Sequence, residues 1–236
     1  MLRQELIRRS PIRVLEKSIH GGLGKGNLGV FAARKGVGKT ACLCHVSLDR
    51  LLEGRSVLHL SFADDPQHIE TWYNQVFREV AQAYKLDDAF DIYDEIAHRK
   101  LIIHFKQKDV TFDHVVETVN RIAGGASFTA QTLIVDGLNM ESMRNEDIRR
   151  WKRYAEEKGI EIWFSATLTS ADEQSADRGI PPSLRPLEDQ LSVIIRLEPV
   201  PGYISLELHK DHDSTDLDKL RLKLDPATLL ISNHRV

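Results

Sequence analysis

The chain has 236 residues, of which 42% are hydrophobic and 28% are charged, and its formal net charge is −3. This length is enough for one large α/β domain with a sizeable core, whereas two independent domains would fit poorly. A charge so near neutrality argues against a general polyanion binder, and the lack of a long apolar run or signal core excludes a membrane span and secretion, so we expect a cytoplasmic protein.

Residues 1–18 form a basic, amphipathic N-terminal segment, and residues 19–236 are expected to form the main domain. In the segment, arginines such as Arg8 and Arg13 alternate with apolar residues such as Leu6. This pattern fits a segment that docks on an adjacent subunit at least as well as an arm that binds phosphates. We prefer the subunit contact.

Residues 33–40 read ARKGVGKT and lie between the apolar run 28–32 and the helix-like stretch 41–52. They match the phosphate-binding pattern GxxxxGK[ST] except at its first position, where Ala33 replaces glycine. In such a loop backbone N–H groups surround phosphate oxygens, the lysine adds positive charge and the hydroxyl completes a magnesium shell. Alanine is costly at the first position only if the backbone there needs a positive φ. The expected nucleotide-binding residues are Arg34, Lys35, Gly36, Val37, Gly38, Lys39, Thr40 and Ala41.

Apolar runs and helix-like stretches alternate through the middle of the chain. The strand-like runs are 57–62, 101–105, 132–135 and 160–164, and the clearest helical periodicity is at 69–84 and 112–122. This alternation predicts a mainly parallel central sheet flanked by helices. Closely spaced runs at 191–197, 203–209 and 217–224 are expected as antiparallel edge strands, and 167–186 as a long loop.

The apolar run 132–135 ends in Asp136, the arrangement that places a magnesium-holding aspartate beside a phosphate loop. The alternative is an ordinary aspartate that begins a turn with Gly137. In a parallel sheet ligands lie at the carboxyl ends of the strands. We therefore expect Asp64, Asp65, Asp136 and residues 165–167 to converge there with Lys39.

Several motifs occur in the order seen in RecA-like ATPases. They are Gly21–Gly26, the ARKGVGKT loop, Ser61–Asp64, the LIVDG run and His209–His212. The sequence most resembles the KaiC, RadA and DnaB helicase group over about residues 19–231. The resemblance implies a RecA-like P-loop ATPase that binds ATP and Mg²⁺ between subunits of a homo-oligomeric ring or filament. It also implies that Ser165 or Thr167 senses the γ-phosphate, although either hydroxyl could simply cap the strand end.

One departure from the family pattern concerns the water-activating glutamate. Ala63 stands at the aligned position, and a methyl group cannot accept a proton. Asp64 could act instead if the strand end is shifted by one residue, although side-chain alternation would turn it away. Alternatively, Asp64 and Asp65 belong to a solvated turn or a helix N-cap, which suits Asp65 especially.

A second departure lies near the C-terminus. The related motors carry a lysine and an arginine that reach into the neighbour's nucleotide, and Lys210 and His212 occupy those places here. Histidine is largely neutral and lacks the planar fork of arginine, so stimulation by the neighbour should be weaker. Lys210 could equally protect an exposed sheet edge.

Nucleic-acid binding has little support in the two loops that carry DNA in the resembling proteins. The loop 138–146 has one arginine against two glutamates, and the loop 167–186 offers no aromatic platform. Its charged residues are Asp172, Glu173, Asp177, Arg178 and Arg185.

The leading hypothesis is therefore an ATPase in which Lys39, Asp64 and Lys210 act in catalysis and Thr40 and Asp136 hold Mg²⁺. The rival is a nucleotide-dependent interaction module that binds ATP and a protein partner but hydrolyses little or nothing. A DNA helicase or recombinase ranks third.

Overall fold

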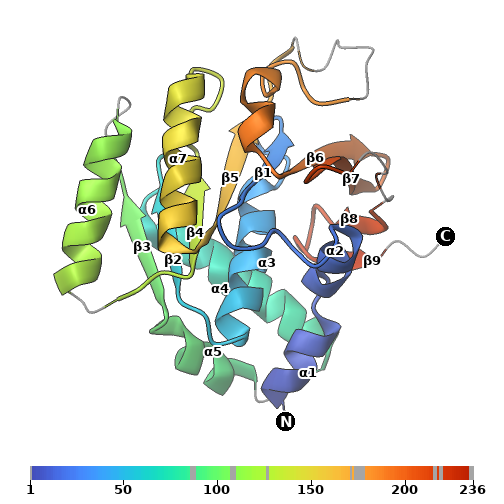
Figure 1. The fold of residues 1–236 in the computed structure, drawn as a ribbon. Helices are drawn as coiled ribbons and strands as arrows, with labels where there is room; N and C mark the ends of the chain where they lie inside the picture. The colour runs from blue at the N-terminus through green and yellow to red at the C-terminus, as the bar shows by residue number, and fades with distance from the viewer. Residues whose placement is uncertain are drawn as a thin grey trace.

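The structure is a computed structural model, and it describes residues 2–85, 89–106, 110–125, 128–170, 172, 179–214, 217 and 220–233. In these residues one 9-stranded sheet runs through the molecule in the order β3-β2-β4-β5-β1-β6-β7-β8-β9 (Figure 1). The strands are β1 Leu28–Ala33, β2 Val57–Ser61, β3 Lys100–His104, β4 Thr132–Asp136, β5 Glu161–Thr167, β6 Val193–Val200, β7 Tyr203–Asp211, β8 Leu222–Leu224 and β9 Ile231–Asn233.

The pairing directions confirm the expected mainly parallel α/β sheet. Strands β1 to β6 pair in parallel, and β7, β8 and β9 add antiparallel. The expectation that all strands after residue 186 are antiparallel was wrong for β6, because β6 pairs in parallel with β1. An apolar run does not encode direction, so this pairing is set by the tertiary fold.

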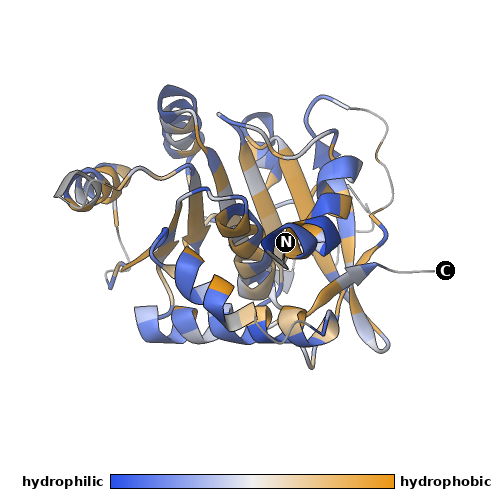
Figure 2. Ribbon diagram, turned by 90° about the horizontal axis from the view of Figure 1, so that it is seen from below, coloured by the Kyte–Doolittle hydropathy of each residue, from blue (hydrophilic) through white to orange (hydrophobic). Residues whose placement is uncertain are grey.

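Helices cover both faces of the sheet (Figures 1 and 2). One face carries α1 Leu2–Arg9, α2 Ile12–Ser18, α3 Lys39–Leu52, α4 Pro66–Ala83 and α5 Ala89–Ala97, and the other carries α6 Phe112–Gly125, α7 Asn145–Lys158 and the 3₁₀ helix η1 Arg185–Gln190. Two apolar clusters fill the layers between sheet and helices. In Figure 2 the strands are largely apolar, while hydrophilic residues gather on the outer faces of the helices.

Several element boundaries differ from the sequence predictions. β5 continues to Thr167 because it pairs with β1 up to Ala33, so Ser165 and Thr167 lie within the strand and do not follow it. β8 begins at Leu222, well after the predicted start at residue 217. The short elements α5 and β9 were not predicted, since so few residues carry little periodic signal. None of the described helices is long and apolar enough to cross a membrane.

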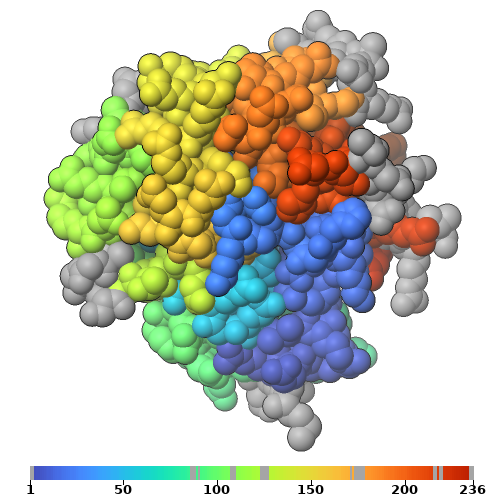
Figure 3. All heavy atoms as spheres, viewed as in Figure 1, coloured from blue at the N-terminus to red at the C-terminus, as the bar shows by residue number. Residues whose placement is uncertain are grey.

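The N-terminal segment packs on the core of its own chain. Leu6, Ile12 and Leu15 are each only 1% exposed and belong to the same apolar cluster as α3. The apolar face that we assigned to a contact with an adjacent subunit is thus occupied by the protein's own helices. Figure 3 shows this segment, in dark blue, lying against the rest of the molecule.

A buried ion network fastens the segment to α3 and the sheet. Arg50 on α3 contacts Glu16 on α2 at 2.6 Å and Glu161 at the start of β5 at 2.5 Å. Arg13 on α2 pairs with Asp49 on α3. The side chains of Arg50 and Glu161 are both only 3% exposed. The network therefore compensates carboxylates that water does not reach.

We predict that Arg50→Met lowers the free energy of unfolding by about 3 to 5 kcal/mol, because it leaves buried carboxylates without a cation. Arg8→Met is the matched control, since the Arg8 side chain is 72% exposed in its pair with Glu5 and its loss should cost under about 0.5 kcal/mol. Chemical denaturation of both variants measures the difference. Equal losses would contradict the assigned role of the network.

Candidate functional site

The phosphate-loop sequence forms a tight connection between β1 and α3. Gly36 and Gly38 have φ angles of 82° and 108°, the left-handed region that glycine adopts most readily. A Cβ at Gly38 would lie 2.5 Å from the Cδ2 atom of Leu224 on β8. The loop therefore needs glycine at position 38 both for its backbone conformation and for close packing against the C-terminal strands.

Ala33 is compatible with its backbone conformation. Positive φ angles occur among the described non-glycine residues at His20, Lys85, His212 and Leu229. Ala33 is thus free of positive φ, and it lies within β1, paired with Thr167. Alanine at the first position of the motif therefore brings no left-handed strain.

Lys39 begins α3 and folds back over the loop. Its Nζ donates hydrogen bonds to the carbonyl oxygens of Ala33 at 3.0 Å and Arg34 at 2.8 Å. Burial lowers the pKa of Lys39, and the Asp136 carboxylate partly opposes that shift. An ammonium group, loop N–H groups and the N-terminus of α3 thus meet at one place, which suits an anion.

Asp136 joins three elements at the carboxyl edge of the sheet. Its Oδ2 accepts a hydrogen bond from Thr40 Oγ1 at 2.8 Å, and its Oδ1 accepts one from Ser165 Oγ at 2.6 Å. The Ser165 hydroxyl in turn accepts from the Gly137 N–H at 2.8 Å. Hydroxyl and carboxylate oxygens are the donors that Mg²⁺ prefers, so Thr40 and Asp136 fit the predicted metal.

The turn after β2 keeps Asp64 near the same edge. The Ser61 hydroxyl donates to the Asp64 carbonyl oxygen at 2.6 Å and accepts from the Asp64 N–H at 3.0 Å. The Asp64 carboxylate forms no hydrogen bond or ion pair with any residue that the structure describes. Asp65 points elsewhere, since its carboxylate caps α4 by accepting from the His68 N–H, as expected for an N-cap.

Ala63 lies where the family pattern has its glutamate. A Cβ added at Gly137 would stand 2.8 Å from the Ala63 Cβ, so the end of β2 packs directly against the residue that follows Asp136. A side chain at position 63 therefore starts beside the candidate metal residues. In this chain that side chain is a methyl group.

Lys210 is not on an exposed sheet edge, which corrects one of its two expected roles. It lies on β7, which β6 and β8 flank, and its Nζ donates to the Glu188 carbonyl oxygen in η1. The hydrogen bond and the half-buried position tie it to its own chain in this structure.

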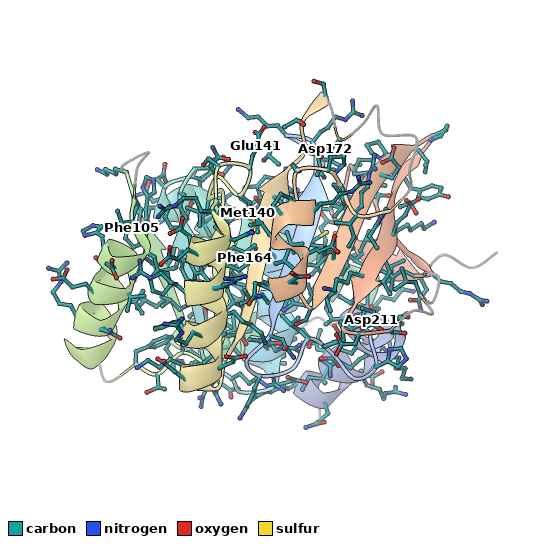
Figure 4. All side chains as sticks on the ribbon, turned by 45° about the horizontal axis from the view of Figure 1, so that its top comes forward. Phe105, Met140, Glu141, Phe164, Asp172 and Asp211 are labelled. Atoms are coloured by element: carbon teal, nitrogen blue, oxygen red, sulfur yellow. The ribbon has the colours of Figure 1, made fainter. Side chains whose placement is uncertain are left out.

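His212 is likewise held within its own chain. Its Nδ1 lies 2.7 Å from Asp211 Oδ1, and its Nε2 lies 3.1 Å from the Leu23 carbonyl oxygen. Asp211 is 1% exposed and also pairs with the ring of His20. Figure 4 labels Asp211 at the end of β7 beside the N-terminal segment.

The two candidate sensors have different surroundings. Ser165 is 2% exposed and bonded to Asp136, whereas Thr167 is exposed at the end of β5. Of the acidic residues in the following loop, Asp172 is 1% exposed and accepts from the N–H groups of Thr169 and Ser183, so it serves the loop's own structure (Figure 4). Glu173, Asp177 and Arg178 lie outside the described residues.

The sequence reading missed one polar neighbour of this site. His59 on β2 is fully buried, with its Nε2 atom 3.9 Å from Asp136 Oδ2. A histidine inside a short apolar strand was the available signal. Which element it faces depends on the strand order, which the sequence does not show.

Comparisons with known proteins agree with this fold. The profile of a family described as AAA domain matches residues 4–162. No curated protein matches the chain. Among solved structures, the ATPase domain of a DnaB-like helicase resembles the chain with a TM-score of 0.70 and 16% sequence identity, over 95% of this chain and 90% of that one. These similarities confirm the expected RecA-like P-loop fold of the KaiC, RadA and DnaB helicase group.

We predict that Ser165→Ala destabilises the protein by about 1 to 3 kcal/mol, because it removes the partner of both the buried Asp136 oxygen and the Gly137 N–H. Ser142→Ala is the control, since the Ser142 hydroxyl is exposed and donates only to the Asn139 carbonyl oxygen at 3.3 Å. Thermal unfolding of both variants tests this. A Ser165→Ala protein as stable as the control would show that the buried contact contributes nothing.

Proposed function

The chain belongs to the family of AAA domains, and from this premise we propose that it is an ATPase that binds and hydrolyses Mg-ATP at interfaces between copies of itself. The observation that carries the proposal is the hydrogen bond between Thr40 and Asp136, with Lys39 on the same loop. A phosphate loop without an adjoining carboxylate would support phosphate binding alone.

Each residue has a proposed role. The loop N–H groups and Lys39 bind the phosphates, and Thr40 and Asp136 hold Mg²⁺. When bound, Mg²⁺ neutralises negative charge on the phosphate oxygens. Asp64 is the proposed acceptor of the proton from the attacking water, because its carboxylate has no partner among the described residues and starts from a turn fixed by Ser61.

Lys210 is proposed to act across a subunit interface. To do so it must give up its hydrogen bond to the Glu188 carbonyl oxygen, so assembly would have to supply a stronger partner such as a phosphate. His212 cannot support it as an arginine would, because its ring is engaged by Asp211 and Leu23. We therefore expect modest stimulation of hydrolysis by oligomerisation.

A nucleotide-dependent interaction module is the second candidate. It is favoured by the Ala63 methyl group beside Gly137, where a proton acceptor would be needed. In that case ATP orders an interface that a protein partner recognises. A DNA motor remains the third candidate, and the cytoplasm remains the proposed location for each of them.

We predict phosphate release from Mg-ATP by the wild-type protein above the level of Lys39→Ala, which serves as the blank. Asp64→Asn should reduce kcat by about 10²-fold or more, because it removes the proposed proton acceptor. Asp65→Asn is the matched control, since asparagine preserves the N-cap of α4 and should leave kcat unchanged.

The outcomes separate the candidates. Binding of ATP without turnover would reject the ATPase in favour of the interaction module. Equal activity of Asp64→Asn and wild type would remove Asp64 from the mechanism. Stimulation by single-stranded DNA that falls steeply with added salt would promote the DNA motor.

We also predict partial recovery of activity when two inactive proteins are mixed. In a mixed oligomer some interfaces pair an intact loop from a Lys210→Ala copy with an intact Lys210 from a Lys39→Ala copy. Phosphate release by the mixture, compared with each protein alone at the same total concentration, measures the recovery. No recovery from a mixture shown to exchange subunits would place the action of Lys210 within its own chain.

A further inference from the structure

His59 lies between the core and the proposed metal residues. It is 0% exposed on β2, and its Nδ1 atom is 3.0 Å from the hydroxyl of Tyr73 on α4. The two rings meet edge to face, with centroids 5.7 Å apart. The opposite ring nitrogen, Nε2, faces Asp136 Oδ2 at 3.9 Å and has no hydrogen-bond partner among the described residues.

The position of the imidazole proton decides what His59 offers to Asp136. Burial lowers the pKa of His59 to about 4, so that the ring is neutral near neutral pH and carries one proton. A proton on Nδ1 would leave the Nε2 lone pair facing a carboxylate, with both groups acceptors. A proton on Nε2 instead faces its N–H toward the negative charge, an attraction strengthened by the buried surroundings.

Tyr73 is compatible with the second arrangement. Its hydroxyl can donate to Nδ1, which is the accepting nitrogen when Nε2 carries the proton. Ser47 on α3 is a competing partner of the same hydroxyl, and the Ser47 proton is itself used by the Leu43 carbonyl oxygen. The charge on Asp136 is therefore the feature that distinguishes the two tautomers.

We propose that His59 is a positioning residue for Asp136, with its Nε2–H directed at Oδ2 so that β2 adds a third donor to those from Thr40 and Ser165. At 3.9 Å the attraction is electrostatic, and a small turn of either side chain makes it a hydrogen bond. A neutral donor orients the carboxylate without competing with a cation for its charge, as a histidinium would. The consequence for Mg²⁺ rests on the proposed function, whereas the tautomer does not.

The tautomer can be measured directly in the nucleotide-free protein. Long-range proton to nitrogen-15 correlation spectra of histidine-labelled protein distinguish a protonated from an unprotonated ring nitrogen, and the His59→Gln spectrum identifies His59 among the ten histidines. We expect Nε2 to be protonated and Nδ1 unprotonated near neutral pH. The reverse assignment would overturn the proposal whether or not the protein binds ATP.

The positioning role is tested by the Mg²⁺ dependence of nucleotide binding. The quantity measured is the Kd for a fluorescent ATP analogue in excess EDTA divided by the Kd in Mg²⁺. Glutamine places an amide N–H near the position of Nε2, so His59→Gln should keep the wild-type ratio. His59→Leu fills the space without a donor and should lower the ratio about tenfold, the size of effect seen for residues that orient metal ligands.

His45→Leu is the matched control for damage to the core. His45 is a buried histidine on α3 that contacts the Leu229 carbonyl oxygen at 2.9 Å, away from Asp136, so its loss should leave the ratio unchanged. A His59→Leu ratio equal to that of wild type, or an equal fall in His45→Leu, would reject the positioning role. Failure of wild type to bind the analogue better than Lys39→Ala would instead reject the proposed function.

Discussion

A buried carboxylate needs hydrogen-bond donors from the protein, and at Asp136 this requirement fixes how three elements meet. The hydroxyls of Thr40 on α3 and Ser165 on β5 donate to its two oxygens, and Ser165 also receives the N–H of Gly137. A shift of β4 against β5, or of α3 against the sheet, would leave at least one of these groups without a partner at a cost of about 1 to 3 kcal/mol. The same bonds that hold the sheet edge together therefore keep the candidate metal residues beside the phosphate loop.

Around this fixed centre, the groups that would complete catalysis are less constrained or differently engaged. Ala63 brings no proton acceptor to the site, and Asp64 begins only from the turn that Ser61 holds. Lys210 and His212 are bonded to carbonyl oxygens of their own chain. Phosphate and metal binding are thus supported by short contacts within one molecule, whereas hydrolysis depends on groups that must move or on a neighbouring copy.

The parts of the fold that could be predicted from sequence are those with local signals. The phosphate loop has fixed spacing, and the long apolar strands and the amphipathic α4 show clear periods. The direction of β6, the extension of β5 to Thr167 and the burial of the N-terminal segment on α3 depend on pairing between residues far apart in the chain. The same reason hid His59, because its neighbours Tyr73 and Asp136 come from different elements. Charge chemistry was readable from the sequence, while the choice of partners was not.

The contact between Gly38 and Leu224 gives the last strands of the chain a direct connection to the loop. His45, on the helix that the loop begins, contacts residues 229 and 231 as well, so both flanks of β8 and β9 sense the position of α3. By thermodynamic reciprocity, a ligand that fixes the loop must also stabilise these strands against local opening. The end of the chain should therefore report site occupancy through slower amide hydrogen exchange, even though no residue there needs to touch the nucleotide.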